Sequence, residues 1–141
     1  MATYADVAVL AAHQLGSVSS VSAREAWEIA AAETFPNSPS MQVKGCPRTI
    51  FLTICASGAL AGIAATGAER ESENARHALD CLALLDKHPE YVDMAPRRLW
   101  ALVTHASGKA YNQQMHVVLG LAKAGLLRYG VLPPVLPAIS A

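Results

Sequence analysis

The sequence has no long apolar segment, no excess of charge of either sign and few cysteine residues. No window reaches the roughly 18 consecutive apolar residues that a membrane-spanning helix needs, so we expect no transmembrane segment. Lys and Arg together number 11, as do Asp and Glu, whereas binding of nucleic acid normally shows as a basic excess. The three cysteines, Cys46, Cys55 and Cys81, are an odd number without a CxxC pair. This pattern argues against a disulfide framework and favours a reducing compartment.

Common metal and cofactor motifs are also missing. The chain has five histidines but no HExxH segment and no Cys/His ladder, so we expect no metal site. The chain has no GxGxxG segment, P-loop or GxSxG elbow, and we expect no cofactor. The N-terminal segment "MATYADVAVL" carries Asp6 in its apolar run and has no basic region. It is not typical of a signal peptide, and we interpret the protein as cytoplasmic.

The chain is instead rich in alanine and leucine at helical spacing. Hydrophobic residues make up 52% of it and β-branched alternation is almost absent, which predicts an all-α fold. The apolar fraction also makes a homo-oligomer a hypothesis. Residues 1–130 are expected to form a single helical domain, and the proline-rich residues 131–141 an extended or disordered tail. We expect about six helices, near residues 4–15, 22–34, 47–57, 73–87, from about 96, and 112–124.

Local signals mark several helix ends. In "SARE", Ser22 and Glu25 have the spacing of a capping box, in which each side chain bonds the backbone N–H of the other. We expect Pro47 at the first position of the third helix, where its missing N–H costs nothing. Gly58 is expected to end that helix in the left-handed conformation. The preceding segment "FPNSPSMQVKG" is rich in Pro, Ser and Asn, which predicts a long irregular loop of the kind that often carries function.

An internal duplication is a further hypothesis. The third helix aligns with the sixth at an offset of 67 residues, which pairs Leu60 with Leu127. The only two tryptophans, Trp27 and Trp100, pair at an offset of 73, and we interpret both as core residues. The fold would then consist of two pseudo-equivalent three-helix units packed together. The alternative is that any two amphipathic helices align through their shared period of 3.6 residues.

A polar notch at two helix N-termini is the candidate ligand-binding site. Lys44 and Arg48 flank Cys46 at the start of the third helix, and Asn112 and Gln114 lie at the start of the sixth. If folding brings these helix ends together, their unpaired N–H groups and dipoles converge and favour an anion. We therefore expect a small anionic ligand or an acidic peptide to bind at these five residues.

Cys46 is also a candidate nucleophile. A helix N-terminus with neighbouring cations is the kind of surrounding in which reactive thiols are found. A nucleophile needs a positioned base, and the candidates are His105 and His116, which flank the "SGKAYN" segment. The alternative is structural: the residue before a proline is extended in any case, and Cys46 simply begins a helix.

The segments "KGCPRTIFLTICASGALAGI", "ENARHALDCLALL" and "NQQMHVVLGLAKAGLL" carry a resemblance. Here the chain resembles a family of small uncharacterised bacterial proteins catalogued only as a domain of unknown function. The resemblance covers residues 5–127 and implies no activity. The loop "AATGAERESE" lacks the aromatic residue that the family pattern often has there. The residues that match the family pattern are Lys44, Gly45, Cys46, Pro47, Arg48, Phe51, Leu52, Cys55, Gly58, Asn74, Asn112, Gln114 and Met115.

Three functional hypotheses follow from these residues. The first is a non-catalytic binding or regulatory protein whose polar notch takes a small anionic ligand or a protein partner. The second is an enzyme that uses Cys46 as its nucleophile. The third is a nucleic-acid binder of the helix-turn-helix type, which the three consecutive helices ending in "NQQMHVVLGLAKAGLL" suggest. The formal net charge of zero makes nucleic acid the least expected partner.

Overall fold

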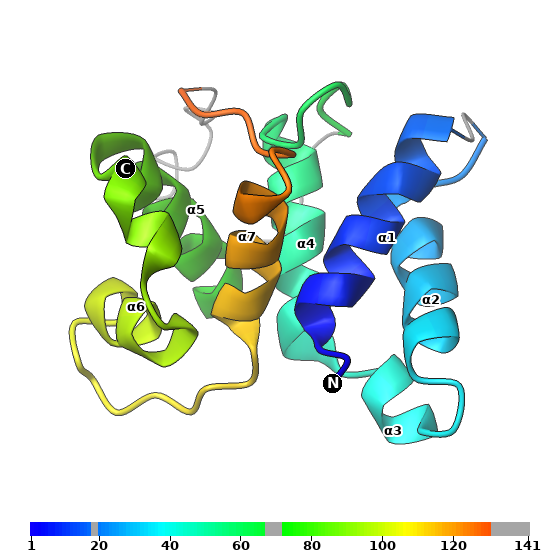
Figure 1. Cartoon of the computed structure of the whole chain (residues 1–141), viewed down its shortest axis with the longest axis horizontal. Coiled ribbons are helices and arrows are strands. Elements are labelled where there is room, and N and C mark those ends of the chain that lie inside the picture. The colour runs from blue at the N-terminus through cyan, green and yellow to red at the C-terminus, as the bar shows by residue number, and fades with distance from the viewer. Residues whose placement is uncertain (18–19, 67–71, 131–141) are drawn as a thin grey trace.

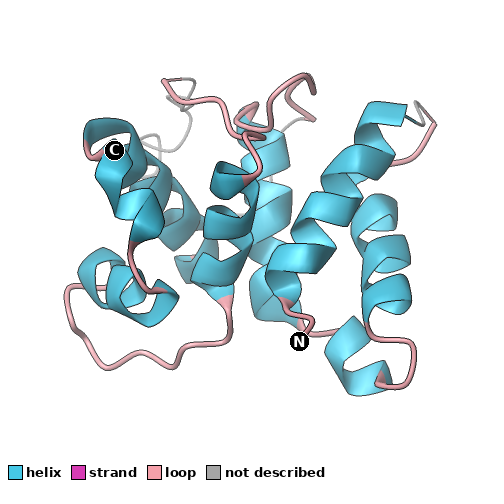
Figure 2. Ribbon diagram, viewed as in Figure 1, coloured by secondary structure: helices cyan, strands magenta, loops and turns pink. Residues whose placement is uncertain are grey.

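The described part of the chain is helical and contains no β-strand. The computed structural model describes residues 1–17, 20–66 and 72–130 (Figure 1). Figure 2 shows these residues as helices and loops without a strand. The only β-type pairing among them is an isolated antiparallel bridge between Leu60 and Leu127. The all-α prediction is confirmed. The elements are α1 (Tyr4–Ser17), α2 (Ala23–Thr34), α3 (Pro39–Gln42), α4 (Gly45–Ser57), α5 (Glu73–Lys87), the 3-10 helix η1 (Pro89–Asp93), α6 (Pro96–Val103) and α7 (Gln114–Lys123).

The expected helices are all present, and the predicted end signals at Ser22 and Gly58 are confirmed. The backbone N–H of Glu25 donates to Ser22 Oγ at 3.1 Å, and that of Ser22 donates to Glu25 Oε1 at 3.0 Å. This is the complete capping box predicted for α2. Gly58 ends α4 with φ of 81°, a conformation that glycine adopts without a steric penalty.

The structure corrects three expected boundaries. The loop after α2 contains the short helix α3, because the Ser38 side chain accepts a hydrogen bond from Met41 N at 3.4 Å. Helix α4 begins at Gly45, so Pro47 stands third and not first. A helix leaves its first four N–H groups without an intrahelical partner, so proline is tolerated there as well. Helix α7 begins two residues later than expected, because Gln113 has a left-handed φ of 64°.

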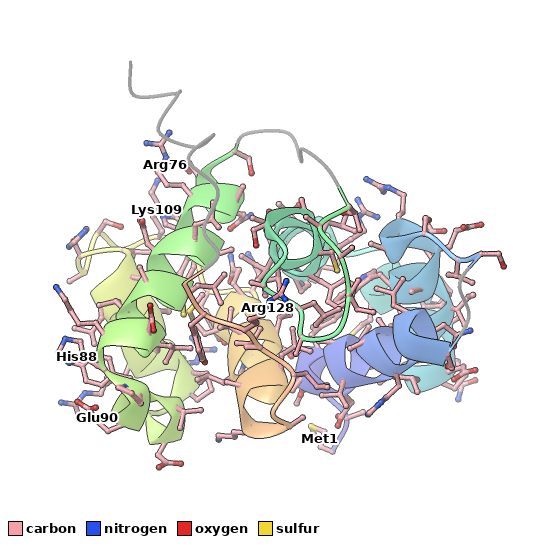
Figure 3. All side chains as sticks on the ribbon, turned by 90° about the horizontal axis from the view of Figure 1, so that it is seen from above. Met1, Arg76, His88, Glu90, Lys109 and Arg128 are labelled. Carbon is pink, nitrogen blue, oxygen red and sulfur yellow. The ribbon has the colours of Figure 1, made fainter. Side chains whose placement is uncertain are left out.

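Helices α4 and α7 lie at the centre of the molecule. Helix α7 contacts α1, α4, α5 and α6, and α4 also contacts α2 and α5. In Figure 1 both helices begin at the lower edge of the view, where α1 begins as well. Their other ends are linked by Arg128, which donates two hydrogen bonds to the Gly58 carbonyl at 2.9 and 3.3 Å. Figure 3 labels Arg128 between these two helices. The chain thus holds the starts of α4 and α7 side by side.

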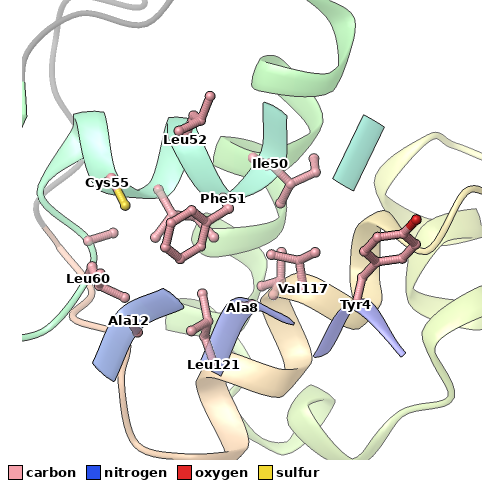
Figure 4. Close-up of a cluster of buried hydrophobic side chains, with 14 of the residues drawn as sticks. Tyr4, Ala8, Ala12, Ile50, Phe51, Leu52, Cys55, Leu60, Val117 and Leu121 are labelled. Atoms are coloured by element: carbon pink, nitrogen blue, oxygen red, sulfur yellow. The ribbon is translucent and has the colours of Figure 1, made fainter. Parts of the chain in front are cut away.

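A continuous hydrophobic core lies between these helices. Phe51 of α4 and Leu121 of α7 are fully buried in it (Figure 4). Burial of a side chain of this size contributes about 1.5–3 kcal/mol. The buried residues of α4, α5 and α6 are mainly their apolar residues, which recur at helical spacing. In α1, Val7 is fully buried and Val9 is half-buried.

The predictions of a tail, a single domain and an internal duplication concern the organisation of the chain. Residues 131–141, predicted as a tail, lie outside the described residues, and the single domain at residues 1–130 stays a prediction. The predicted duplication pairs Leu60 with Leu127, and these two residues do form the bridge. That pairing joins the ends of α4 and α7 without establishing two equivalent units, so the duplication also stays a prediction. No helix in the described part of the chain is long and apolar enough to span a membrane.

Candidate functional site

The starts of α4 and α7 meet through Cys46 and Asn112. The Asn112 Nδ2 group donates to Cys46 Sγ at 3.9 Å, across 66 positions of sequence. Both side chains are half-buried. Lys44 is the N-cap residue of α4 and makes no side-chain capping bond. Lys44 is exposed. The convergence of the two helix starts that the sequence suggested is therefore present.

A cavity of about 290 Å³ opens beside this contact. We call it the amide cavity, because three carboxamide side chains, those of Asn74, Asn112 and Gln114, contribute to its wall. The complete set of lining residues is Cys46, Glu73, Asn74, His77, Trp100, Lys109, Ala110, Asn112 and Gln114.

Hydrogen bonds fix the carboxamides of the amide cavity in place. Gln114 is only 2% exposed, and its Oε1 accepts from the backbone N–H of Asn112 at 2.6 Å. Its Nε2 donates to Asn74 Oδ1 at 3.3 Å. Since a buried amide must find partners for both its ends, this chain of bonds defines the orientation of Gln114. Asn74 and Asn112 are thereby connected through one buried side chain.

The remaining wall of the amide cavity is aromatic and ionic. The His77 ring packs edge-on against Trp100 with centroids 5.0 Å apart, and burial lowers the pKa of His77, an effect that nearby Glu73 and Asp80 oppose. Nδ1 of His77 is buried without a hydrogen-bond partner in the described residues. Lys109, at the edge of the molecule in Figure 3, pairs with Glu73 at 3.0 Å. This pair neutralises both charges at the cavity rim.

A second cavity, of about 440 Å³, lies on the other side of Asn112. We call it the cationic cavity, because Lys44 and Arg97 line it and no acidic residue does. Its lining residues are Tyr4, Met41, Lys44, Arg97, Tyr111, Asn112, Gln113 and His116. Asn112 belongs to the wall of both cavities, so the two are neighbours.

Tyr111 organises the cationic cavity. Its hydroxyl accepts from the backbone N–H of His116 at 3.1 Å, which supplies a partner at the start of α7, where Gln113 makes no side-chain cap. The same hydroxyl bonds His116 Nδ1. Burial, followed by Arg97 and Lys123, lowers the pKa of His116, which favours the neutral ring. The Arg97 guanidinium lies 5.2 Å from the centre of the Tyr111 ring.

The structure separates the five residues predicted for the notch. Cys46, Asn112 and Gln114 line the amide cavity, whereas Lys44 lines the cationic cavity. Arg48 is half-buried and lines neither of these two cavities. The notch predicted as one site is therefore divided at Asn112, and its cationic part has a different arginine.

The two candidate bases do not lie in the amide cavity with Cys46. His105 is exposed and lines a third cavity between α5 and α6, and His116 lines the cationic cavity. His77 shares the amide cavity with Cys46 but was not a sequence candidate. Arg97 was missed as well, because an "RR" pair at the start of a helix carries no signal of what it faces. Among the described residues, no three His, Cys, Asp or Glu side chains are grouped as a metal ion requires.

The fold and its two cavities define a small helical protein with a polar site at the starts of two central helices. The chain belongs to DUF6979, a family of unknown function, which matches residues 1–128. The family membership that the resemblance predicted is confirmed. No curated protein and no solved structure matches the chain.

Proposed function

We propose that this protein is a non-catalytic binding protein that takes a small anionic ligand in the cationic cavity. The proposal rests on one observation: Lys44 and Arg97 line the same cavity, and no acidic side chain lines it. The two residues come from distant parts of the chain, before α4 and on α6. A concave surface lined by positive charges raises the local concentration of anions and their rate of association.

The size and chemistry of the cavity agree with a small ligand. Its volume of about 440 Å³ lies in the usual range for ligand pockets, roughly 300–1,000 Å³. Arginine offers a planar pair of donors that suits a carboxylate or phosphate, and lysine adds a compact point charge. The Asn112 amide lies in the same wall. A carboxylate or phosphate group would meet all three.

Thermal melting with a panel of anions tests this function. Phosphate, sulfate, acetate and citrate are added to the wild type at constant ionic strength, and a ligand that binds only the folded state raises Tm. We expect a rise with at least one anion and its loss in Lys44→Gln and Arg97→Gln. Arg48→Gln is the matched control, because it removes one positive charge from a residue outside both cavities and should keep the rise. The proposal is wrong if no anion raises Tm, or if Arg48→Gln abolishes the effect as fully as Arg97→Gln.

A cysteine enzyme is the second candidate function. Cys46 and His77 line the same cavity, and Asn74 lies beside them, which is the set of residue types that cysteine nucleophiles use. The test is the rate of iodoacetamide reaction at Cys46 across pH 5–9 in wild type and His77→Asn. If His77 activates Cys46, alkylation of the wild type should remain fast at low pH. The His77→Asn variant should lose this fast alkylation. Identical pH profiles would eliminate the enzyme.

The geometry does not favour the nucleic-acid alternative. A recognition helix must present a free face to the major groove, whereas α7 is enclosed by four helices and its first residue, Gln114, is 2% exposed.

Location and assembly complete the proposal. We infer a cytoplasmic protein of a bacterial cell, supported by three free cysteines and by the resemblance of the sequence. A homo-oligomer is supported by the high apolar fraction of the chain and by Leu102, which is 43% exposed. Size-exclusion chromatography with light scattering measures the oligomeric state directly.

A further inference from the structure

The two cavities meet at Asn112, and the geometry points to a ligand with two chemically different ends. We infer that the anion held in the cationic cavity also carries a neutral hydrogen-bonding group, a carboxamide or the equivalent edge of a nucleobase, that enters the amide cavity. This inference rests on the proposed function and adds the ligand class. The volumes of about 290 and 440 Å³ together leave room for a metabolite larger than a simple anion.

The hydrogen bonds inside the amide cavity determine which groups are left for a ligand. Asn74 uses Oδ1 to accept from Gln114, so its Nδ2 is the group that can donate to a ligand. Asn112 uses Nδ2 toward Cys46 Sγ, so its Oδ1 is the group that can accept. A donor and an acceptor in one small cavity complement a group that offers both, and a carboxamide does so in a single plane.

The electrostatics of the amide cavity favour a neutral group over a second charge. Glu73 and Lys109 are the charged residues in its wall, and they pair with each other at 3.0 Å. Lys109 holds the pKa of Glu73 below its ordinary value, so the carboxylate stays ionised and the pair stays formed at neutral pH. A bare carboxylate in this cavity would have amides as partners but no unpaired cation. The cationic cavity, by contrast, has Lys44 and Arg97 without a carboxylate.

Probe pairs of equal charge test the inference by NMR titration of Kd. Pentanoate and glutaramate, its analogue with a terminal carboxamide, have equal chain length and one negative charge each. Ribose 5-phosphate and cytidine monophosphate form a second pair, without and with a base. One or two neutral hydrogen bonds predict that the second member of at least one pair binds about 3- to 20-fold more tightly. The pair that shows the preference identifies the source of the neutral group.

The variant Asn74→Asp separates this effect from folding. Aspartate keeps the oxygen that accepts from Gln114 Nε2, and an acid in the first turn of α5 is favourable to the helix. It removes the Nδ2 donor, so the preference within the probe pair should fall to less than about 2-fold. The matched control is Lys87→Gln, which changes the net charge by the same amount at the opposite end of α5 and should keep the full preference. Pentanoate and glutaramate carry the same charge, so the added negative charge of Asn74→Asp weakens the binding of both equally. This electrostatic effect therefore cancels in the ratio of their Kd values.

Each outcome assigns the result to one proposal. A preference in the wild type that Asn74→Asp removes and Lys87→Gln keeps supports the two-ended ligand. Binding of both members of each pair with equal Kd, lost in Arg97→Gln, overturns the two-ended ligand and leaves the anion site intact. A preference that survives Asn74→Asp also overturns it, because the amide cavity is then not the source. Absence of binding by all four probes and by the simple anions overturns the proposed function and this inference with it.

Discussion

Replacing Gly120 with alanine should destabilise the protein, because α7 packs tightly against α1 at this residue. A Cβ atom added at Gly120 would lie 2.7 Å from Ala5 Cβ, 2.9 Å from Ala5 Cα and 3.2 Å from Ala5 O. Non-bonded carbon atoms are at their best distance at about 3.5–4.0 Å. Two of the three atoms that the new methyl would meet are backbone, so no side-chain rotation relieves the contact. The two helices would have to move apart.

Two opposing terms set the size of the effect. Overpacking a well-filled interior costs about 1–3 kcal/mol, and the rigid backbone of α1 places this contact at the upper end. Alanine gains about 0.8–1.0 kcal/mol over glycine in a helix interior. The expected net loss is about 1–2 kcal/mol in the free energy of unfolding. For a chain of this size, that lowers Tm by roughly 3–8 °C.

Gly16→Ala is the matched control, measured by the same urea and thermal unfolding. Gly16 lies in α1, and nothing stands within 4 Å of an added Cβ, so only the helix propensity changes and the protein should gain up to about 1 kcal/mol. The double variant Ala5→Gly with Gly120→Ala should recover part of the loss, since it removes the 2.7 Å contact and leaves the backbone contacts. If Gly120→Ala is as stable as Gly16→Ala, the close packing of α1 on α7 is wrong.

Three further measurements follow from the structure. Native protein should expose one thiol to a disulfide reagent, that of Cys46, and three after unfolding, because Cys55 and Cys81 are 0% exposed and burial raises the pKa of Cys55 to about 12; three reactive thiols in native protein would contradict the fold. Ser22→Ala should cost about 1 kcal/mol by urea unfolding, since it removes the capping box of α2, and an unchanged midpoint would exclude the cap. Burial lowers the pKa of His77 below the ordinary 6.5, so the unfolded state takes up this proton first as pH falls, and stability decreases below about pH 6.5. His77→Gln should flatten that decrease, and an unaltered profile of Tm between pH 7 and pH 5 would assign it to other groups.

Local signals predicted most of the fold. The capping box at Ser22 and the left-handed glycine at Gly58 depend on residues within one turn of each other, so the sequence contains all the information they need. The apolar spacing of α5 was equally sufficient for its buried face. Helix α3 escaped prediction because a four-residue helix has too little periodicity to be seen. The left-handed Gln113 escaped because glycine, not glutamine, is the usual residue there.

The site was only half predictable, and the reason is its long-range construction. Cys46 and Asn112 could be paired because each lies within two residues of the start of a helix that the sequence predicts. Arg97 enters the cationic cavity only because α6 packs on α7, a contact that no local pattern records. His77 lies beside the apolar face of α5, and the sequence does not show that Trp100 of α6 packs against its ring. The sequence shows which residues are present, but it does not give the distances between helices that decide which residues line one cavity.

The connection between α6 and α7 shows why the site is more than a by-product of packing. Helix–helix connections usually take 2–8 residues, whereas residues 104–113 make a longer one. It contains every described non-glycine residue with positive φ, namely His105, Ala106 and Gln113, and such conformations cost of order 1 kcal/mol each. The strain persists because distant groups hold the segment: Trp100 Nε1 donates to the carbonyl oxygen of Lys109 at 2.9 Å, and the backbone N–H of Tyr4 donates to Gln113 Oε1 at 3.0 Å. A shorter, relaxed connection would also join the two helices, but it would not place the Asn112 carboxamide between a neutral cavity and a cationic one.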